Sequence, residues 1–141
     1  PNTAISLGKS VTFIASNNTT AEQDSMVMDL FKALGEVFEI SENQITAVTA
    51  LSSSGIAYAF KYNDAAMQGG MEMGIRQQEA LGIVISTMKG AVAMLEANGL
   101  QPQQEIDKVT TPGGITLKGL EAMENNGFTQ AVIEGLLATK F

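Results

Sequence analysis

The residues with the clearest capacity for chemistry lie in positions 109–120, which read VTTPGGITLKGL. Two hydroxyl residues, Thr110 and Thr111, precede Pro112, Gly113 and Gly114. Because glycine has no Cβ, this backbone can turn sharply and approach a ligand closely. The run that follows predicts a helix, whose first N–H groups and positive dipole end favour a negative charge. The stretch therefore predicts a site for a small anion such as a carboxylate.

Two other interpretations use the same residues. A phosphate-binding loop combines glycines with a helix start in this way, but the spacing and the lysine of the P-loop are absent. An ordinary helix start behind a flexible loop would also have this composition. Spacing alone leaves this second alternative open.

The composition restricts any other chemistry. The 141 residues include no cysteine and no histidine, which excludes thiol nucleophiles, histidine general bases and zinc sites of the usual kind. We expect no metal site, so catalysis would depend on hydroxyls, carboxylates, backbone N–H groups or a cofactor. The lack of cysteine fits a cytoplasmic location.

Charge and hydropathy narrow the partners. The net charge is −7 and aromatic residues make up 6 % of the chain, so no basic patch interleaved with aromatics is present and we expect no nucleic-acid binding. Asn63, Asp64, Lys89 and Glu96 interrupt the apolar runs, and we expect no membrane span. Because the sequence starts at Pro1 and not at a methionine, we expect further protein upstream.

The first 41 residues predict a strand, a helix and a second strand. Residues 11–15 and 36–40 are rich in β-branched and aromatic residues, which favours strands. Between them Thr20 and Gln23 have the spacing of a capping box, and Gly35 is a suitable helix stop. One βαβ unit is too small to be stable as a sheet on its own. We therefore expect residues 1–41 to be the end of a larger α/β domain.

The remaining residues predict a mainly α fold. After a second capping box at Ser41 and Gln44, we expect helices at 45–52, 55–73, 76–98, 102–108, 115–126 and 128–141. The helix at 55–73 is apolar on nearly every side, which predicts burial all round. In so small a domain this burial favours a partner chain, and the eight methionines fit adaptable packing in such an interface.

Two polar features of this region have ordinary explanations. The serines at 52–54 predict a tight junction between two helices, because a hydrolase elbow would need Gly-x-Ser-x-Gly and a histidine. Asp64 lies in the helix that we expect to be buried, so its carboxylate needs a partner there.

Three stretches resemble the pyrroline-5-carboxylate reductase family. Residues 47–58, AVTALSSSGIAY, are similar to the family's AVTALSGSGPAY, and residues 69–75, GGMEMGI, to its GGVKMGL. Residues 109–120 resemble its VTSPGGTTIAGL, and the PNT at the start resembles its MPNTP. The resemblance covers essentially the whole chain. Ala4, Ser53, Ile56 and Ile115 depart from the family pattern, and Ser53 and Ile56 bear on the shape of the helix junction.

The resemblance implies a subunit of two domains. Residues 1–41 would be the C-terminal end of a dinucleotide-binding Rossmann domain. Residues 42–141 would be a helical dimerisation and substrate-binding domain, like the C-terminal domain of 6-phosphogluconate dehydrogenase. The intact enzyme would bind NAD(P)H. The present stretch contains no Gly-x-Gly-x-x-Gly, so we expect it to bind no cofactor by itself.

The resemblance also implies a reaction, which is reduction of 1-pyrroline-5-carboxylate to L-proline by an NAD(P)H-dependent homodimer or higher oligomer. Thr116 would be catalytic, donating or relaying a proton to the imine nitrogen. Asn2 would contact the nicotinamide end of the cofactor. The residues implied in substrate binding are Thr111, Gly113, Gly114, Ile115 and Thr116.

Two alternatives to this function stay open at the level of sequence. The chain could be a non-catalytic helical dimerisation domain that keeps a regulatory small-anion loop. It could also belong to a reductase of the same family that acts on another cyclic imino acid, because the site would bind any such ring mainly through its carboxylate.

Overall fold

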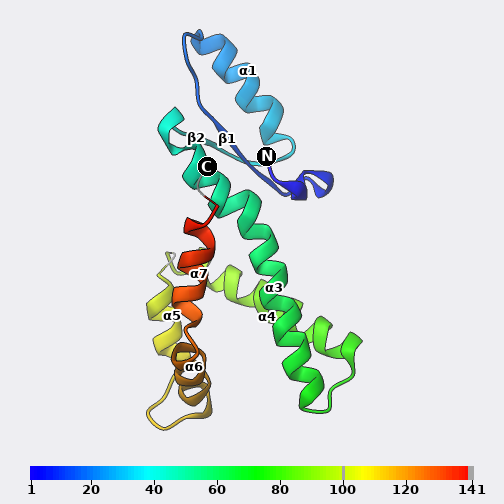
Figure 1. Cartoon of the computed structure of the whole chain (residues 1–141). Coiled ribbons are helices and arrows are strands. Elements are labelled where there is room, and N and C mark those ends of the chain that lie inside the picture. Colours follow the sequence, from blue (N-terminus) through cyan, green and yellow to red (C-terminus); the bar gives the residue numbers. More distant parts are fainter. Residues whose placement is uncertain (100, 140–141) are drawn as a thin grey trace. The chain divides into compact units, whose positions relative to one another are not determined.

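The computed structural model describes residues 1–99 and 101–139, which form two compact units (Figure 1). Unit 1 contains residues 1–59 and the described residues from 133 onward, and unit 2 contains residues 60–132. The expectation of a mainly α fold preceded by a short βαβ unit is confirmed. Residues 140 and 141, the end of the last expected helix, lie outside the described residues.

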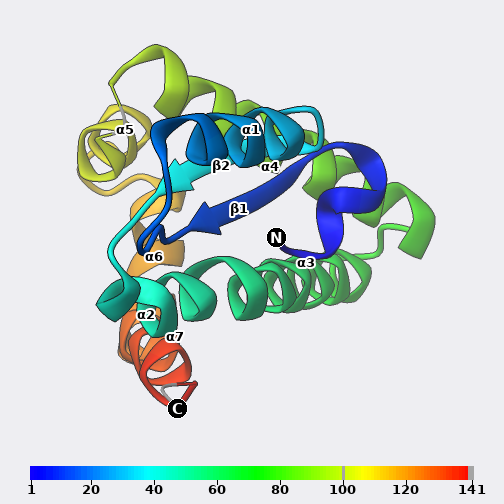
Figure 2. The ribbon, with the colours of Figure 1, turned by 90° about the horizontal axis from the view of Figure 1, so that it is seen from above.

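Unit 1 contains a two-stranded parallel sheet. Strand β1 (Ser10–Ile14) pairs with β2 (Gly35–Glu39), with Ser10 opposite Gly35 and Ile14 opposite Glu39. Helix α1 (Ala21–Lys32) connects the two strands and packs beside β2 (Figure 2). A short 3₁₀ helix, η1 (Thr3–Leu7), precedes the sheet. Both predicted strands and the connecting helix are thus confirmed.

The capping box of α1 is also confirmed. Thr20 Oγ1 accepts a hydrogen bond from Gln23 N at 3.3 Å, and Gln23 Oε1 accepts one from Thr20 N at 2.9 Å. The expected stop at Gly35 is wrong, because Ala33 caps the helix. Gly35 is the first residue of β2, with φ +144°, and a Cβ there would collide with the backbone of Ser10. Glycine at this position therefore serves close strand pairing.

A continuous helix replaces the two helices that we expected between residues 45 and 73. After the 3₁₀ turn η2 (Glu42–Gln44), α2 (Ile45–Thr49) passes into a π-helical turn, η3 (Ala50–Ser54), and then into α3 (Gly55–Glu72). The N–H of Gly55 bonds the carbonyl oxygen of Ala50, five residues earlier, which is the π pattern. The three serines widen the helix by one residue and do not break it.

Unit 2 contains most of the remaining helices. They are α4 (Gln77–Ala97), α5 (Pro102–Val109), α6 (Ile115–Asn125) and the first half of α7 (Phe128–Leu137). All four lie at or close to their predicted positions. Gly70 lets α3 and α4 approach closely, because a Cβ there would lie 3.1 Å from the Cβ of Ala80. The helical glycine at this position is thus explained by packing.

The single chain leaves most of its apolar side chains uncovered. Among the described residues, the buried hydrophobic ones are Ala50 and Ala80. In α3, which we expected to be buried on all sides, Gly70 is the buried residue. One chain alone therefore does not bury α3, and its burial against a partner chain stays a prediction. Asp64 is half-exposed and is paired within its own helix, with Gln68 Nε2 at 2.8 Å and Lys61 Nζ at 3.8 Å.

Helix α4 corrects another expectation. Its length and composition would allow it to cross a membrane, and only 6 % of its most apolar window is buried. The expectation that no apolar run reaches this length is wrong, because Lys89 and Glu96 do not lower the mean hydropathy of the helix enough. An exposed apolar helix surface of this length is stable only when other apolar groups cover it.

The fold predicts opposite effects for two glycine substitutions. Gly35→Ala adds a Cβ at positive φ against the Ser10 backbone, so we expect a loss of about 3 kcal/mol or more in the free energy of unfolding. Gly69→Ala is the matched control, since no atom lies within 4 Å of the added Cβ, and alanine should stabilise α3 by about 0.5–1 kcal/mol. Urea titrations followed by circular dichroism at one protein concentration measure both. Equal stability of Gly35→Ala and the original chain would contradict the strand pairing.

Candidate functional site

The loop between α5 and α6, residues 110–114, is built around a tight turn. Gly114 N donates a hydrogen bond to Thr111 O at 2.9 Å. Pro112 occupies the second position of this turn, and Gly113, with φ +72°, occupies the third. This combination is typical of a type II turn, in which proline presets φ and glycine adopts the positive φ that follows.

Gly114 has a different task from Gly113. It caps α6 with extended backbone angles, φ −71° and ψ 160°, and no side chain caps the helix. A Cβ on Gly114 would lie 2.6 Å from Thr111 Oγ1 and 3.0 Å from Thr111 O. Glycine here therefore lets the Thr111 side chain lie directly beside the start of α6.

The first turn of α6 presents unpaired donors. Lys118 N donates the first hydrogen bond of the helix, to Gly114 O at 3.3 Å. The N–H groups of Ile115, Thr116 and Leu117 precede it and have no carbonyl oxygen to bond within the helix. Thr111 and Thr116 are exposed, and within the described part of the chain their hydroxyls make no hydrogen bond. Ile115 is 88 % exposed. Its apolar side chain cannot donate a hydrogen bond, so its backbone N–H is the group that could bind an anion. These donors suit a small anion.

The two threonines before the turn differ. Thr110 Oγ1 donates to the carbonyl oxygen of Ile106 at 3.0 Å and so closes the end of α5. The Thr111 hydroxyl makes no such bond to the end of α5. Of the predicted site residues, Thr111, Gly113, Gly114, Ile115 and Thr116 therefore lie together in this one loop and helix start.

Asn2 lies in unit 1 and already has a structural role. Its Oδ1 accepts a hydrogen bond from Ala4 N at 3.2 Å and caps η1, while its backbone N donates to Ser10 Oγ at 3.2 Å. Ser10 is buried and its hydroxyl lies 3.3 Å from that of buried Thr12. The amide nitrogen of Asn2 is the part of its side chain that is left for a ligand, and its cofactor role stays a prediction.

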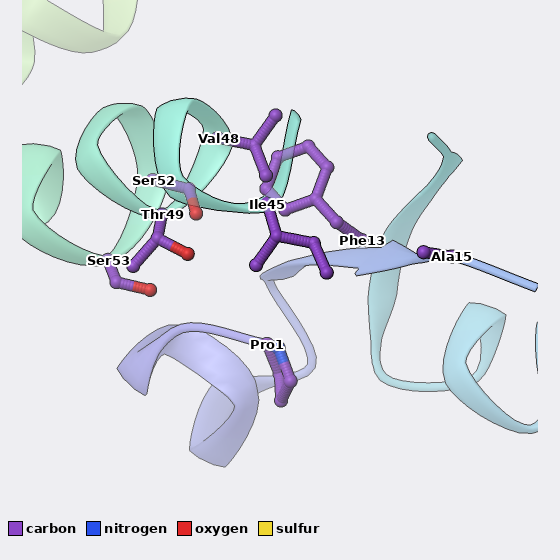
Figure 3. Close-up of a pocket in the computed structure, with 8 residues that line it drawn as sticks. All are labelled: Pro1, Phe13, Ala15, Ile45, Val48, Thr49, Ser52 and Ser53. Carbon is purple, nitrogen blue, oxygen red and sulfur yellow. The ribbon is translucent and has the colours of Figure 1, made fainter. Parts of the chain in front are cut away.

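A hollow that the sequence does not predict lies in unit 1 beside Pro1. It has a volume of about 190 Å³, and its walls come from the carboxyl end of β1, the chain start and one stripe of α2 and η3 (Figure 3). Phe13 is held in place by stacking on Phe38, with ring centroids 5.8 Å apart. The lining residues are Pro1, Phe13, Ala15, Ile45, Val48, Thr49, Ser52 and Ser53.

The polar side of this hollow comes from the helix. Thr49, Ser52 and Ser53 lie on its side that faces Pro1 and Phe13 (Figure 3). Their hydroxyls make no hydrogen bond within the described residues. The spacing of these three residues, i, i+3 and i+4, is a sequence signal for a shared face. Parallel sheets bind ligands at the carboxyl ends of their strands, which favours this hollow as a second binding position.

The ionisable groups offer no competing centre. Among residues 1–99 and 101–139, no cluster of three or more acidic side chains could hold a metal ion. Arg76 and Glu79 form an ion pair in the first turn of α4, and the hydrogen bond from Arg76 lowers the pKa of Glu79 and in turn raises that of Arg76. Both groups are exposed, so this pair belongs to the helix start.

The loop lies within a stretch that matches a known protein family. The family described as "Pyrroline-5-carboxylate reductase dimerisation" matches residues 42–140, which include the turn and the whole of α6. The chain belongs to this family. The resemblance seen in the sequence is confirmed.

Individual relatives agree with the family. Pyrroline-5-carboxylate reductase 1 of Dictyostelium discoideum is 38 % identical over 151 residues, which cover 99 % of this chain and 27 % of the relative. The reductase of Aquifex aeolicus is 35 % identical over 135 residues, covering 95 % of this chain and 51 % of its own length. The chain thus spans about half, or less, of the curated relatives that it matches.

Solved structures are similar along the whole chain. The 1-pyrroline-5-carboxylate reductase of Streptococcus pyogenes matches with a TM-score of 0.96 and 31 % identity, over 99 % of this chain and 54 % of its own. Pyrroline carboxylate reductase of Plasmodium falciparum, solved with NADP bound, matches with a TM-score of 0.94 and 29 % identity, over 99 % of this chain and 56 % of its own.

Proposed function

We propose that the chain is the dimerisation and substrate-binding part of a pyrroline-5-carboxylate reductase that reduces 1-pyrroline-5-carboxylate to L-proline. The observation that supports this most is the type II turn that leads into α6, because it lies inside the family match and presents unpaired donors. We assign residues 1–41 to the end of the Rossmann domain and residues 42–141 to the helical domain. The first matched residue, 42, supports this boundary.

The substrate carboxylate binds at the start of α6. The N–H groups of Ile115 and Thr116 and the hydroxyl of Thr111 donate to it, and the helix dipole adds to the attraction. Gly113 and Gly114 contribute by shape, since one turns the chain and the other keeps space for the Thr111 side chain. Cyclic imino acids with another ring would share this carboxylate contact.

Thr116 acts at the imine nitrogen. Bound NAD(P)H supplies the hydride that adds to the C=N carbon, and the nitrogen then takes up a proton. The hydroxyl of Thr116 donates a hydrogen bond to that nitrogen and relays the proton from water, because a threonine hydroxyl is too weak an acid to be the ultimate proton source. This chain thereby orients the imine, while the cofactor carries the difficult chemistry.

We propose that the intact enzyme places the nicotinamide end of NAD(P)H at the hollow beside Pro1, the neighbour of Asn2 in sequence. The bound NADP in the relative from Plasmodium falciparum supports a nicotinamide cofactor for the family. The hollow offers an aromatic wall at Phe13 and the hydroxyls of Thr49, Ser52 and Ser53, which suit a flat ring that carries an amide. We keep the cytoplasm as the proposed compartment, since the chain has no cysteine.

The chain functions as a homodimer. Among the described residues only Ala50 and Ala80 are buried and apolar, and α4 is apolar and uncovered over most of its length. A second copy supplies the missing apolar surface, in keeping with the dimerisation family. In this assignment the second copy covers α4, so the helix does not need a membrane.

The first functional prediction concerns assembly. The 141-residue chain should sediment as a dimer at micromolar concentration, because an obligate interface of this kind buries about 2,000 Å² or more. Sedimentation equilibrium measures this directly, with circular dichroism to establish that the sample is helical. A folded, stable monomer at that concentration would refute the homodimer.

The second functional prediction concerns the intact enzyme. Thr116→Ala should lower kcat more than it changes KM, by about 10-fold if water replaces the relay and by about 10²- to 10⁴-fold if it does not. Thr111→Ala should mainly raise KM, because the carboxylate contact is equal in the ground and transition states. Ile115→Ala is the matched control and should change little, since its backbone makes the contact.

Steady-state kinetics on these three variants, each checked for folding, separate the roles. If Thr116→Ala keeps the original kcat and KM, the loop is an ordinary helix start and the site assignment is wrong. The alternative of a non-catalytic anion sensor would give proline binding to the loop without any reductase activity in the intact protein.

The third functional prediction concerns the cofactor. The 141-residue chain alone should show no heat of NAD(P)H binding at micromolar concentrations in calorimetry, because it lacks the glycine-rich turn that binds the pyrophosphate. The intact enzyme serves as the positive control. Tight binding by the 141-residue chain would overturn the two-domain assignment and require a nucleotide site within these residues.

A further inference from the structure

A second cavity lies in unit 2, between the end of α4 and α5. It has a volume of about 250 Å³, and its lining is apolar except for one carboxylate. The lining residues are Ala91, Met94, Leu95, Pro102, Glu105, Ile106 and Val109. We call this cavity the α4–α5 groove.

Glu105 is an unusual residue to line such a groove. Its side chain is only 11 % exposed, and Oε1 pairs with Lys108 Nζ at 2.6 Å. Its other oxygen, Oε2, is buried and receives no hydrogen bond from any described residue. A buried carboxylate oxygen without a donor is costly, and covering the groove with purely apolar groups would not relieve that cost.

The groove continues a larger uncovered surface. Ala91, Met94 and Leu95 belong to α4, whose other exposed apolar residues include Leu81, Ile83, Ile85 and Val92. A chain that packs along α4 can therefore extend into the groove. A lipid chain cannot donate a hydrogen bond to Glu105, whereas a second protein chain can. The groove also lies within the region that matches a dimerisation family, which favours a second copy of this chain.

We propose that a second copy of the chain fills the α4–α5 groove with apolar side chains and donates an N–H or O–H group to Glu105 Oε2. This inference rests on the proposed homodimer and specifies one of its contacts. It also connects the interface to the anion loop. Ile106 lines the groove, and its carbonyl oxygen accepts the hydrogen bond from Thr110 that anchors the loop at 110–114.

The test compares the dimer dissociation constants of variants of the 141-residue chain by sedimentation. Glu105→Leu should raise the dissociation constant at least 10-fold, because the donor of the second copy would be left buried and unpaired. Glu105→Gln keeps an acceptor oxygen and should weaken the dimer less. Met94→Ala, which removes apolar contact in the groove without touching Glu105, should also weaken it about 10-fold.

Two matched controls lie outside the groove. Met26→Ala removes an exposed methionine on α1, and Glu121→Leu changes an acidic residue on α6 that does not line the groove. Neither should change the dissociation constant by more than about threefold. Circular dichroism establishes that every variant keeps its helical content.

Each outcome has a distinct meaning. If the original chain dimerises but Glu105→Leu dimerises equally well or more tightly, no donor reaches Oε2 and the inference is wrong. If Met94→Ala leaves the dissociation constant unchanged, the groove lies outside the interface and the inference is also wrong, while the homodimer stands. If the original chain is monomeric and floats with phosphatidylcholine vesicles, lipid covers α4 and both proposals fail.

Discussion

The structure of this chain depends on apolar helix surface that one copy cannot cover. Nearly half of its residues are hydrophobic, yet the buried apolar side chains among the described residues are two alanines. Where helices do approach, they use small residues, as Gly70 and Ala80 do between α3 and α4. The hydrophobic effect scales with the area removed from water, so most of the stabilisation available to these helices must come from surfaces outside these 141 residues.

The proposed substrate loop is, by contrast, shaped by local geometry. Proline sets one turn position, Gly113 adopts the positive φ of the next, and Gly114 leaves room for Thr111. None of these constraints requires a core, which explains why the loop is readable from sequence while the packing around it is not. The donors of α6 follow from the helix itself, because its first N–H groups have no earlier carbonyl in the helix.

The same distinction separates the correct predictions from the wrong ones. The capping box at Thr20 and the helix starts at Pro102 and Ile115 depend on neighbours in sequence, and the structure agrees with them. Gly35 was misinterpreted because its reason is the backbone of Ser10, 25 positions away in sequence and opposite in the sheet.

Helix type and the source of cover for an apolar face cannot be predicted from residue spacing alone. Apolar periodicity reports which residues need cover but not what provides it, and for α3 we expect that cover from a partner chain. The three serines lie in a π turn, whose extra residue the sequence spacing does not predict. The hollow lined by Thr49 beside this turn is for the same reason not predicted.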